Sequence, residues 1–164
     1  MKKLEEYKNT VVGVIPEDWE VKELGNVTNL NMGKTPKRNE KIYWDNGIYS
    51  WVSIKDMQNK YISKTKEKVS KKAFEKVFKE KIVSKGTLLM SFKLTVGKVG
   101  ILNIDAFHNE AIISIHSKKE TSRDFLYYYM NGIDYSKYID NAVKGKTLNK
   151  SKLQNLKITL PPLP

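Results

Sequence analysis

Three short apolar runs in the middle of the chain constrain the fold more than any other feature. GTLLMSF covers residues 86–92, VGKVGILNI covers residues 96–104, and AIISIH covers residues 111–116. None approaches the ~20 apolar residues that a membrane helix needs. Their lengths and apolar content are typical of buried strands. We therefore expect them to form the inner strands of a sheet.

Helical patterns flank these runs. Residues 69–78 carry apolar side chains at helical spacing with lysines opposite. Residues 121–132 begin with a Thr-x-x-Asp variant of the capping box and end at a glycine, and residues 134–145 repeat this format. The sequence therefore predicts two short helices after the sheet.

Three further elements are predicted from local signals. Pro16 and the acids that follow it suit a helix that ends at Gly25. Asp45-Asn46-Gly47, between β-branched and aromatic residues, is the strongest short signal for a hairpin. The chain closes with a strand that the prolines after Leu160 cannot continue.

The charge is large and unevenly distributed. The chain of 164 residues has a formal net charge of +12, and residues 55–98 alone hold thirteen lysines against four acids. Residues 143–164 hold five lysines and no acid. Such segregation indicates a polyanionic partner such as nucleic acid. The alternative is a solvated, lysine-coated surface.

Several kinds of site are disfavoured by residue types. Cysteine is absent, which excludes disulfides and thiolate metal sites, and two histidines are too few for most zinc arrangements. SFKLTVGKVG fails as a phosphate-binding Walker loop, because Phe92 and Val99 replace the required glycine and hydroxyl residue. We expect no metal, no cofactor, no membrane partner and a cytoplasmic location.

Five separated motifs occur in an order that resembles a known family. They are YKNTVVGVIPEDWEVKELGNV near the start, GKTP, GTLLMSFKLTVGKVGIL, FHNEAI, and LNKSKLQNLKITLPPLP at the end. They are spread over nearly the whole chain, from residue 7 to residue 164, and resemble one target recognition domain of the specificity subunit of type I restriction-modification systems.

The resemblance implies an α+β fold, with a curved, partly barrel-like mixed β-sheet and short peripheral helices. It implies one recognition domain over residues 1–164, with residues 1–14 as an N-terminal arm and residues 156–164 as a strand leading to a spacer helix. The family continues beyond this point, so we expect the first recognition domain of a longer subunit rather than a natural half-length subunit.

The resemblance also implies a function. Such a domain reads one half of a split double-stranded DNA target and is not catalytic. Modification methyltransferase subunits, which use S-adenosylmethionine, and restriction subunits, which use ATP, would be its partners. A basic RNA- or protein-binding assembly module is the alternative, and a stand-alone nuclease is a third hypothesis.

Catalytic interpretations of individual residues are weaker than structural ones. Glu17, Asp18 and Glu20 could hold a metal in a nuclease, but we expect them to stabilise a helix N-terminus. LPPL lacks the polar and aromatic members of an adenine methyltransferase loop. His108, although close to Glu110, is expected to be a packed or surface histidine. Of the three consecutive tyrosines at 127–129, at least one is expected to pack in the core.

The candidate DNA contacts lie in polar loops. Lysines beside glycines suit phosphates, arginine can pair with guanine, and amides can pair with adenine. The predicted phosphate contacts are Lys34, Lys37, Lys93, Lys98, Lys144 and Lys146. The predicted base contacts are Arg38, Gln58, Asn59 and Thr95. Solvated loops, and a turn at Asn59, are the alternatives.

Overall fold

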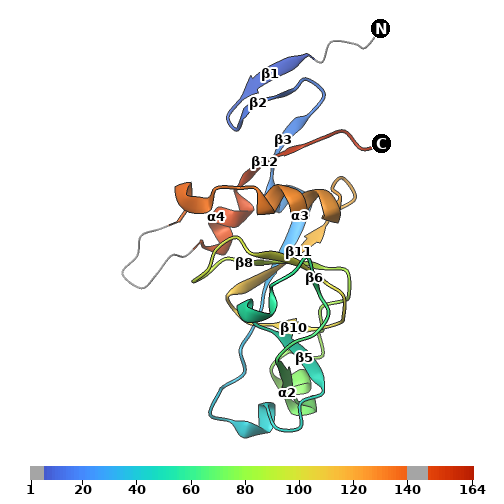
Figure 1. Cartoon of the computed structure of the whole chain (residues 1–164), viewed down its shortest axis with the longest axis vertical. Coiled ribbons are helices and arrows are strands. Elements are labelled where there is room, and N and C mark those ends of the chain that lie inside the picture. The colour runs from blue at the N-terminus through green and yellow to red at the C-terminus, as the bar shows by residue number, and fades with distance from the viewer. Residues whose placement is uncertain (1–5, 140–147) are drawn as a thin grey trace.

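The computed structural model describes residues 6–139 and 148–164, and its elements are spread along a long axis (Figure 1). The strands are β1 (Tyr7–Thr10), β2 (Gly13–Pro16), β3 (Glu20–Glu23), β4 (Thr28–Met32), β5 (Tyr49–Val52), β6 (Tyr61–Ile62), β7 (Glu67–Val69), β8 (Leu88–Ser91), β9 (Val99–Leu102), β10 (Phe107–His108), β11 (Ile112–Ser117) and β12 (Lys157–Leu160). The α-helices are α1 (Leu24–Val27), α2 (Lys71–Lys76), α3 (Arg123–Asn131) and α4 (Lys150–Gln154), and the 3₁₀ turns are η1 (Lys41–Tyr43), η2 (Ile54–Asp56) and η3 (Tyr135–Lys137).

A mixed five-stranded sheet forms the centre of the molecule, in the order β4-β11-β8-β9-β6. The first four strands are antiparallel to one another, whereas β6 runs parallel to β9. The three apolar runs supply β8, β9 and β11, so this prediction is confirmed. The α+β class with short helices around a mixed sheet is also confirmed, although the sheet does not close into a barrel.

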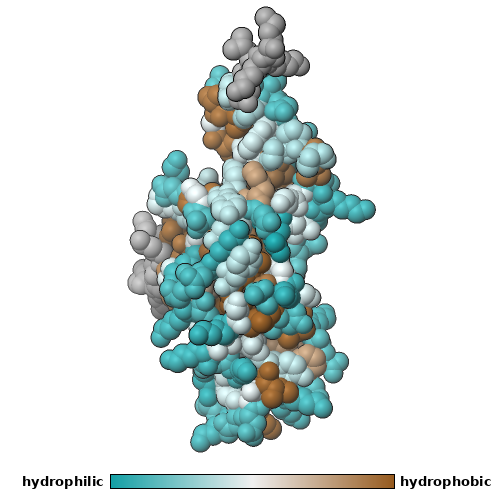
Figure 2. Space-filling view, turned by 45° about the vertical axis from the view of Figure 1, so that its right-hand side comes forward, coloured by the Kyte–Doolittle hydropathy of each residue, from teal (hydrophilic) through white to brown (hydrophobic). Residues whose placement is uncertain are grey.

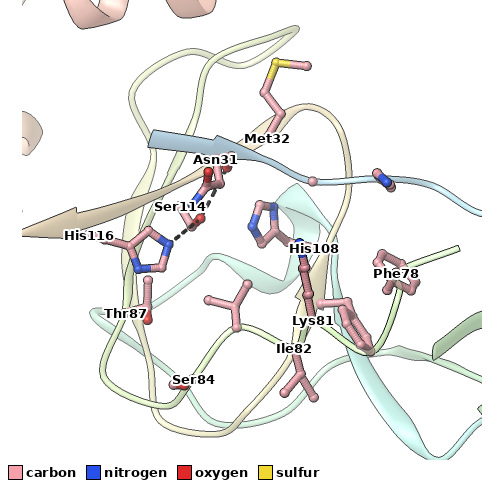
Figure 3. A pocket seen from close by; sticks show the side chains of 14 residues that line it. Asn31, Met32, Phe78, Lys81, Ile82, Ser84, Thr87, His108, Ser114 and His116 are labelled. Atoms are coloured by element: carbon pink, nitrogen blue, oxygen red, sulfur yellow. Dashed lines mark hydrogen bonds between the residues drawn. The ribbon is translucent and has the colours of Figure 1, made fainter. Parts of the chain in front are cut away.

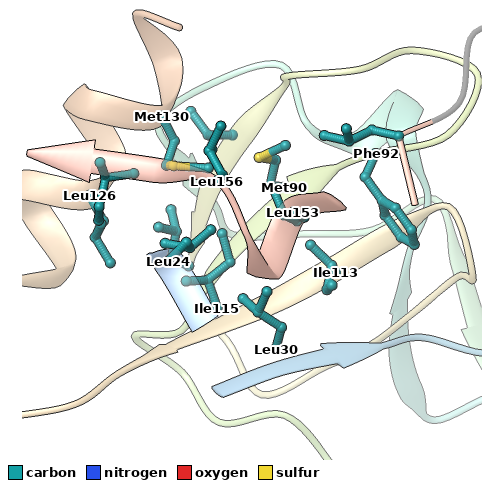
Figure 4. Close-up of a cluster of buried hydrophobic side chains, with 14 of the residues drawn as sticks. Leu24, Leu30, Met90, Phe92, Ile113, Ile115, Leu126, Met130, Leu153 and Leu156 are labelled. Carbon is teal, nitrogen blue, oxygen red and sulfur yellow. The ribbon is translucent and has the colours of Figure 1, made fainter. Parts of the chain in front are cut away.

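The inner strands β8, β9 and β11 are buried on both faces over most of their length, which explains their continuous apolar runs. Because side chains alternate along a strand, Leu88 and Met90 enter one core cluster while Leu89 enters another. Likewise Ile113 points to the first cluster and Ile112 to the second. Figure 4 shows the first cluster, where the helices at the C-terminal end of the chain cover the sheet.

A third cluster is aromatic and lies at the opposite end from the β1–β2 hairpin (Figure 1). It belongs to the three-stranded sheet β10-β5-β7 and to α2. Phe78 stacks on Phe107 with ring centroids 3.9 Å apart, and Trp51 is 1% exposed. This aromatic unit is one support of the candidate site described below.

Two local predictions are wrong because long-range pairing outweighs local propensity. Residues 20–23, expected to be helical, form β3 and pair with β12 from the other end of the chain. The helix-dipole role assigned to Glu17, Asp18 and Glu20 therefore fails, and Glu20 lies in the strand. Residues 44–46 form a turn, but β5 pairs with β7 and β10 rather than with the preceding segment.

The helix predictions for residues 69–78 and 121–132 are confirmed in α2 and α3, and the terminal strand is β12. The helix expected over residues 134–145 is not confirmed: its first residues form only the 3₁₀ turn η3, and residues 140–145 lie outside the described residues. The cap of α3 is Ser122 rather than the expected Thr121. No helix in residues 6–139 or 148–164 has the length and apolarity to cross a membrane.

Candidate nucleic-acid interface

One end of the central sheet gathers several of the predicted contact residues. β4 ends at Met32, β8 ends at Ser91, and β9 begins at Val99. The antiparallel registers place Met32 opposite Ile113, and Ser91 opposite Ile112. Two loops therefore leave the sheet side by side, the first loop (residues 33–40) after β4 and the second loop (residues 92–98) between β8 and β9.

Residues 108–112 connect the two loops. The amides of Gly33 and Lys34 donate to the carbonyls of Ile112 and His108, at 3.2 and 2.9 Å. The amide of Phe92 donates to the Ala111 carbonyl at 2.9 Å. The motifs GKTP, SFKLTVGK and FHNEAI, which are far apart in sequence, thus meet at one place.

The close contact between the first loop and residues 108–112 requires a glycine at position 33. A Cβ atom at this position would lie 2.1 Å from the carbonyl oxygens of both His108 and Asn109. Contacts this short with backbone atoms cannot be relieved by a side-chain rotation. The first loop can therefore dock against residues 108–112 only because position 33 has no side chain.

The first loop is held in place by its polar groups. The indole of Trp51 donates to the Lys34 carbonyl at 3.0 Å, and that of Trp44 donates to the Lys37 carbonyl at 3.2 Å. The hydroxyl of Thr35 donates to the Glu110 carboxylate. These bonds fix the path of the loop backbone.

Arg38 is bound within the protein. Its two Nη atoms donate to the Glu67 carboxylate at 2.5 and 3.2 Å. Its Cζ atom lies 4.0 Å from the ring centroid of Trp44 and 4.9 Å from that of Trp51. A guanidinium paired and stacked in this way is preorganised, and this geometry favours a positioning role over a direct contact with guanine.

The lysines of the first loop remain on the surface. Lys34 is exposed, and its Nζ donates to the Val77 carbonyl at 3.4 Å. Lys37 is exposed and lies 3.1 Å from Glu40, whose hydrogen bond raises the pKa of the lysine. Surface contacts of this kind are weak.

The second loop is rigid at its base. The amides of Ser91 and Gly97 bond to the carbonyls of Lys98 and Ser91, at 2.8 and 2.9 Å, and the Lys98 amide donates to the Ser91 hydroxyl at 3.0 Å. Gly97 has φ +95°, and a Cβ there would lie 2.8 Å from the ring of Tyr135. The second loop is thus a tight connection between β8 and β9.

The polar side chains of the second loop have few partners. Within the described part of the chain, the side chains of Thr95 and Lys98 make no hydrogen bond or ion pair, and Lys93 contacts only the ring of its neighbour Phe92, at 5.2 Å. Thr95 is exposed, and the two lysines are half-buried. These groups are available to an external ligand.

A third segment reaches the same end of the sheet. Lys60 precedes β6, and its carbonyl accepts from Ile101 at 2.7 Å in β9. The adjacent Gln58 and Asn59 are exposed, and the Gln58 amide donates to the Lys55 carbonyl at 2.8 Å. Both amides keep unused donor and acceptor capacity.

Lys60 was not among the predicted contacts. Its ammonium donates to the Tyr128 hydroxyl at 3.0 Å and lies 4.8 to 5.4 Å from the ring centroids of Tyr61, Tyr127 and Tyr128. The bond to Tyr128 raises the pKa of Lys60, so the group stays cationic. Its place among the lysines of residues 55–98 is the only sequence signal for it.

A cavity of about 490 Å³ opens beside the first loop (Figure 3). It lies between the aromatic unit and the face of the central sheet opposite the first core cluster. Its lining includes Lys34 and Lys81 and no carboxylate. Ser114 lies 2.9 Å from Nε2 of His116, but no acid in the lining orients this imidazole. The lining therefore lacks the third member of a hydrolytic triad.

The two histidines are structural. His108 is 3% exposed, and burial lowers its pKa to about 4, so it is neutral at pH 7. This confirms the prediction of a packed histidine. Burial also lowers the pKa of His116. Among residues 6–139 and 148–164, no three His, Asp or Glu side chains are grouped to hold a metal ion.

One of the three consecutive tyrosines, Tyr129, packs against the first core cluster, and its hydroxyl accepts from the Thr159 amide at 3.1 Å. This confirms that at least one of the three packs in the core. Lys144 and Lys146 lie outside the described residues. Leu148, next to them in sequence, donates its amide to the Phe92 carbonyl at 2.9 Å.

The surface is mostly hydrophilic in the view of Figure 2, with apolar side chains visible near both ends of the long axis. Val11 and Val14 are exposed in the β1–β2 hairpin, and Ile42 and Ile48 are exposed near the aromatic unit. The end of the central sheet where the two loops lie differs from both ends of the molecule's long axis, because the exposed side chains there are mainly cationic and polar.

Comparison with known proteins follows the whole length of this fold. The model of the family described as "Type I restriction modification DNA specificity domain" matches residues 16–164. The chain is 30% identical over 162 residues to the MjaIX specificity subunit of Methanocaldococcus jannaschii, covering 97% of the chain and 37% of that protein. It is 28% identical over 152 residues to the HindI specificity subunit of Haemophilus influenzae, covering 90% and 33%. The chain thus spans about a third of the length of these relatives.

Solved structures show the same fold. The HsdS subunit of Thermoanaerobacter tengcongensis superposes with a TM-score of 0.68 at 22% identity, covering 95% of this chain and 36% of that one. A chain from work on complex assembly and conformational transition of the type I R-M system gives a TM-score of 0.70 at 20% identity, covering 91% and 35%.

Proposed function

Because the chain belongs to the family of type I restriction modification DNA specificity domains, we propose that it binds double-stranded DNA and recognises one half of a bipartite target. The match of the family model over residues 16–164 is the observation that carries this proposal. The cationic loop end of the central sheet supplies a physical basis for it.

Contacts to phosphate fix the duplex in place and carry most of the affinity. We assign them to the lysines of the two loops and of the segment before α4, with Lys60 added by its position. The set is Lys34, Lys37, Lys60, Lys93, Lys98, Lys144 and Lys146. Their cationic charge suits a polyanion, and no carboxylate of the described residues pairs with Lys93 or Lys98.

Contacts to base edges specify the sequence. Gln58, Asn59 and Thr95 are exposed next to these lysines and carry donors and acceptors that suit base edges. Arg38 acts differently in this proposal: it positions the first loop through Glu67, and its charge adds to the local field.

The chain itself performs no chemistry in this proposal. Residues 1–164 form one recognition unit, with residues 1–14 as an arm and residues 156–164 leading toward the rest of a longer subunit. Modification methyltransferase subunits that use S-adenosylmethionine, and restriction subunits that use ATP, would act on the DNA that it selects. The cytoplasm is where such a chain would meet DNA.

Selection of duplexes from a random pool by the purified chain tests the proposal. We expect enrichment of one short sequence. The logarithm of its binding constant should fall linearly with the logarithm of the salt concentration between ~50 and ~200 mM. Structured RNA is the competitor, since an assembly module would prefer it. Equal binding of RNA and of unselected duplexes, or a flat response to salt, would refute the proposal.

A further inference from the structure

The tip of the second loop presents an exposed apolar side chain between a lysine and a threonine. Leu94 is 70% exposed, whereas Phe92 and Val99 at the two ends of the same loop are buried at 0% and 8%. Lys93 and Thr95 flank Leu94 in the chain, and Lys98 returns to the sheet four residues later. The isobutyl group of Leu94 is thus exposed to solvent between two lysines of the candidate site.

The backbone holds Leu94 in this position. Its φ is +64°, in the left-handed region that L-residues other than Asn and Asp rarely adopt. The loop below it is fixed by the bonds of Ser91 to Gly97 and Lys98, and by those of Phe92 to residues 111 and 148. Unfavourable backbone geometry that a rigid loop maintains is typical of functional positions.

From this geometry we infer that Leu94 is a wedge that enters the base stack of the bound duplex. This inference rests on the proposed function. A leucine side chain has no donor or acceptor for a base edge, but aliphatic side chains are known to insert between base steps and partly unstack them. Lys93 and Lys98 bind the phosphates beside the insertion and counter the repulsion between the strands.

The rigid loop makes such insertion favourable. A side chain that is already outside the protein core loses no internal packing when it enters DNA, and a fixed backbone loses little conformational entropy on binding. The apolar surface of Leu94, exposed in the free protein, becomes buried between bases. The wedge acts on any base step, so it contributes affinity and deformation rather than sequence choice.

The test uses the duplex selected by the wild-type chain, with 2-aminopurine placed at each adenine in turn. We expect the wild-type chain to raise the fluorescence at one or two adjacent positions. Leu94→Asn should abolish this signal and lower the affinity by on the order of tenfold. Asn suits a positive φ, so this variant should fold at least as stably as the wild type.

Two matched variants complete the experiment. Leu94→Met keeps an apolar side chain and should keep both signal and affinity, whereas Val11→Ala removes another exposed apolar side chain, 84% exposed in the hairpin, and should change neither. Unchanged fluorescence and affinity in Leu94→Asn would overturn the wedge. Loss of affinity on replacing thymine by deoxyuridine, without any fluorescence change, would also overturn it and indicate a methyl contact. Failure of the wild-type chain to select any duplex would instead refute the proposed function.

Discussion

The first and second loops leave the same end of the central sheet, and each contains a Gly-Lys pair, at residues 33–34 and 97–98. In the first loop, carbonyls and side chains are engaged by two tryptophans and two glutamates. In the second, hydrogen bonds hold the base, while Thr95 and Lys98 have no side-chain partner in the described part of the chain. Similar composition thus gives one anchored loop and one loop with side chains available for binding.

The physical cause of this difference lies in what each loop lies against. The first loop lies over the aromatic unit, where indole N–H groups need acceptors and Glu67 needs a cation. The second loop is a tight connection between neighbouring strands, whose hydrogen bonds are completed by its own backbone. The two loops therefore have similar composition, and their surroundings decide how much of each loop is engaged by the rest of the protein.

Gly33→Ala should break the anchored loop and have the largest effect. The added Cβ would meet two carbonyl oxygens at 2.1 Å, so we expect a loss of about 3 kcal/mol or more in the free energy of unfolding. Urea denaturation measures this. Gly132→Ala is the control, because its Cβ would meet the nearest atoms at 3.6 Å. Equal stability of both variants would contradict the docking described for Gly33.

Acid should weaken the segment that connects the loops. His108 has a folded-state pKa of about 4, below the ~6.5 of an unfolded histidine, so the unfolded chain binds more protons between these values. The contribution of neutral His108 to the free energy of unfolding is therefore fully present above pH ~6.5. It decreases as the pH falls, by up to roughly 3 kcal/mol near pH 4. Thermal denaturation across this range should show a smaller slope in His108→Gln.

His116 adds to the same slope, since its pKa is lowered as well. His116→Gln therefore serves as the comparison, with a smaller reduction expected because this side chain is only half-buried. An identical pH slope in wild type and His108→Gln would show that the buried imidazole does not control acid stability.

Removing the cations of the second loop should affect binding without affecting the fold. We expect Lys93→Ala combined with Lys98→Ala to lower duplex affinity by on the order of 10–100-fold at ~0.1 M salt, and to reduce the salt slope by about 2. Stability should change by less than about 0.5 kcal/mol, because the replaced side chains have few internal partners. Lys119→Ala, in the segment after β11, provides a control. An unchanged salt slope in the double variant would exclude phosphate contacts at these positions.

Arg38→Met should produce the smallest effect and the reverse pattern. Loss of the Glu67 pair and of the contacts with Trp44 and Trp51 should cost about 1–2 kcal/mol of stability. The sequence preference of the bound duplex should stay the same. Arg38→Lys should not restore the stability, because an ammonium cannot pair bidentately and stack at once. A relaxed preference at one guanine would instead assign Arg38 to base recognition.

The sequence predicted those parts of the fold that local patterns encode. The apolar runs gave β8, β9 and β11, helical spacing gave α2 and α3, and the prolines mark the end of β12. It failed where a partner from elsewhere in the chain decides: Val21 pairs with Thr159, and β5 pairs with β7 rather than with the residues before Asn46. The residues next to residue 20 in the sequence do not indicate that this segment pairs with a strand from the other end of the chain.

For the candidate interface, the sequence predicted which residue types are present: the lysine-rich segments, the glycines that permit close approach, and the family motifs with their order. How these residues are used depends on tertiary contacts. The tertiary structure brought residues 33, 92 and 108–112 together, bound Arg38 to Glu67, added Lys60, and left Leu94 exposed. The reason is physical: charge and propensity belong to single residues, whereas burial, pairing and exposure are properties of contacts between residues distant in sequence.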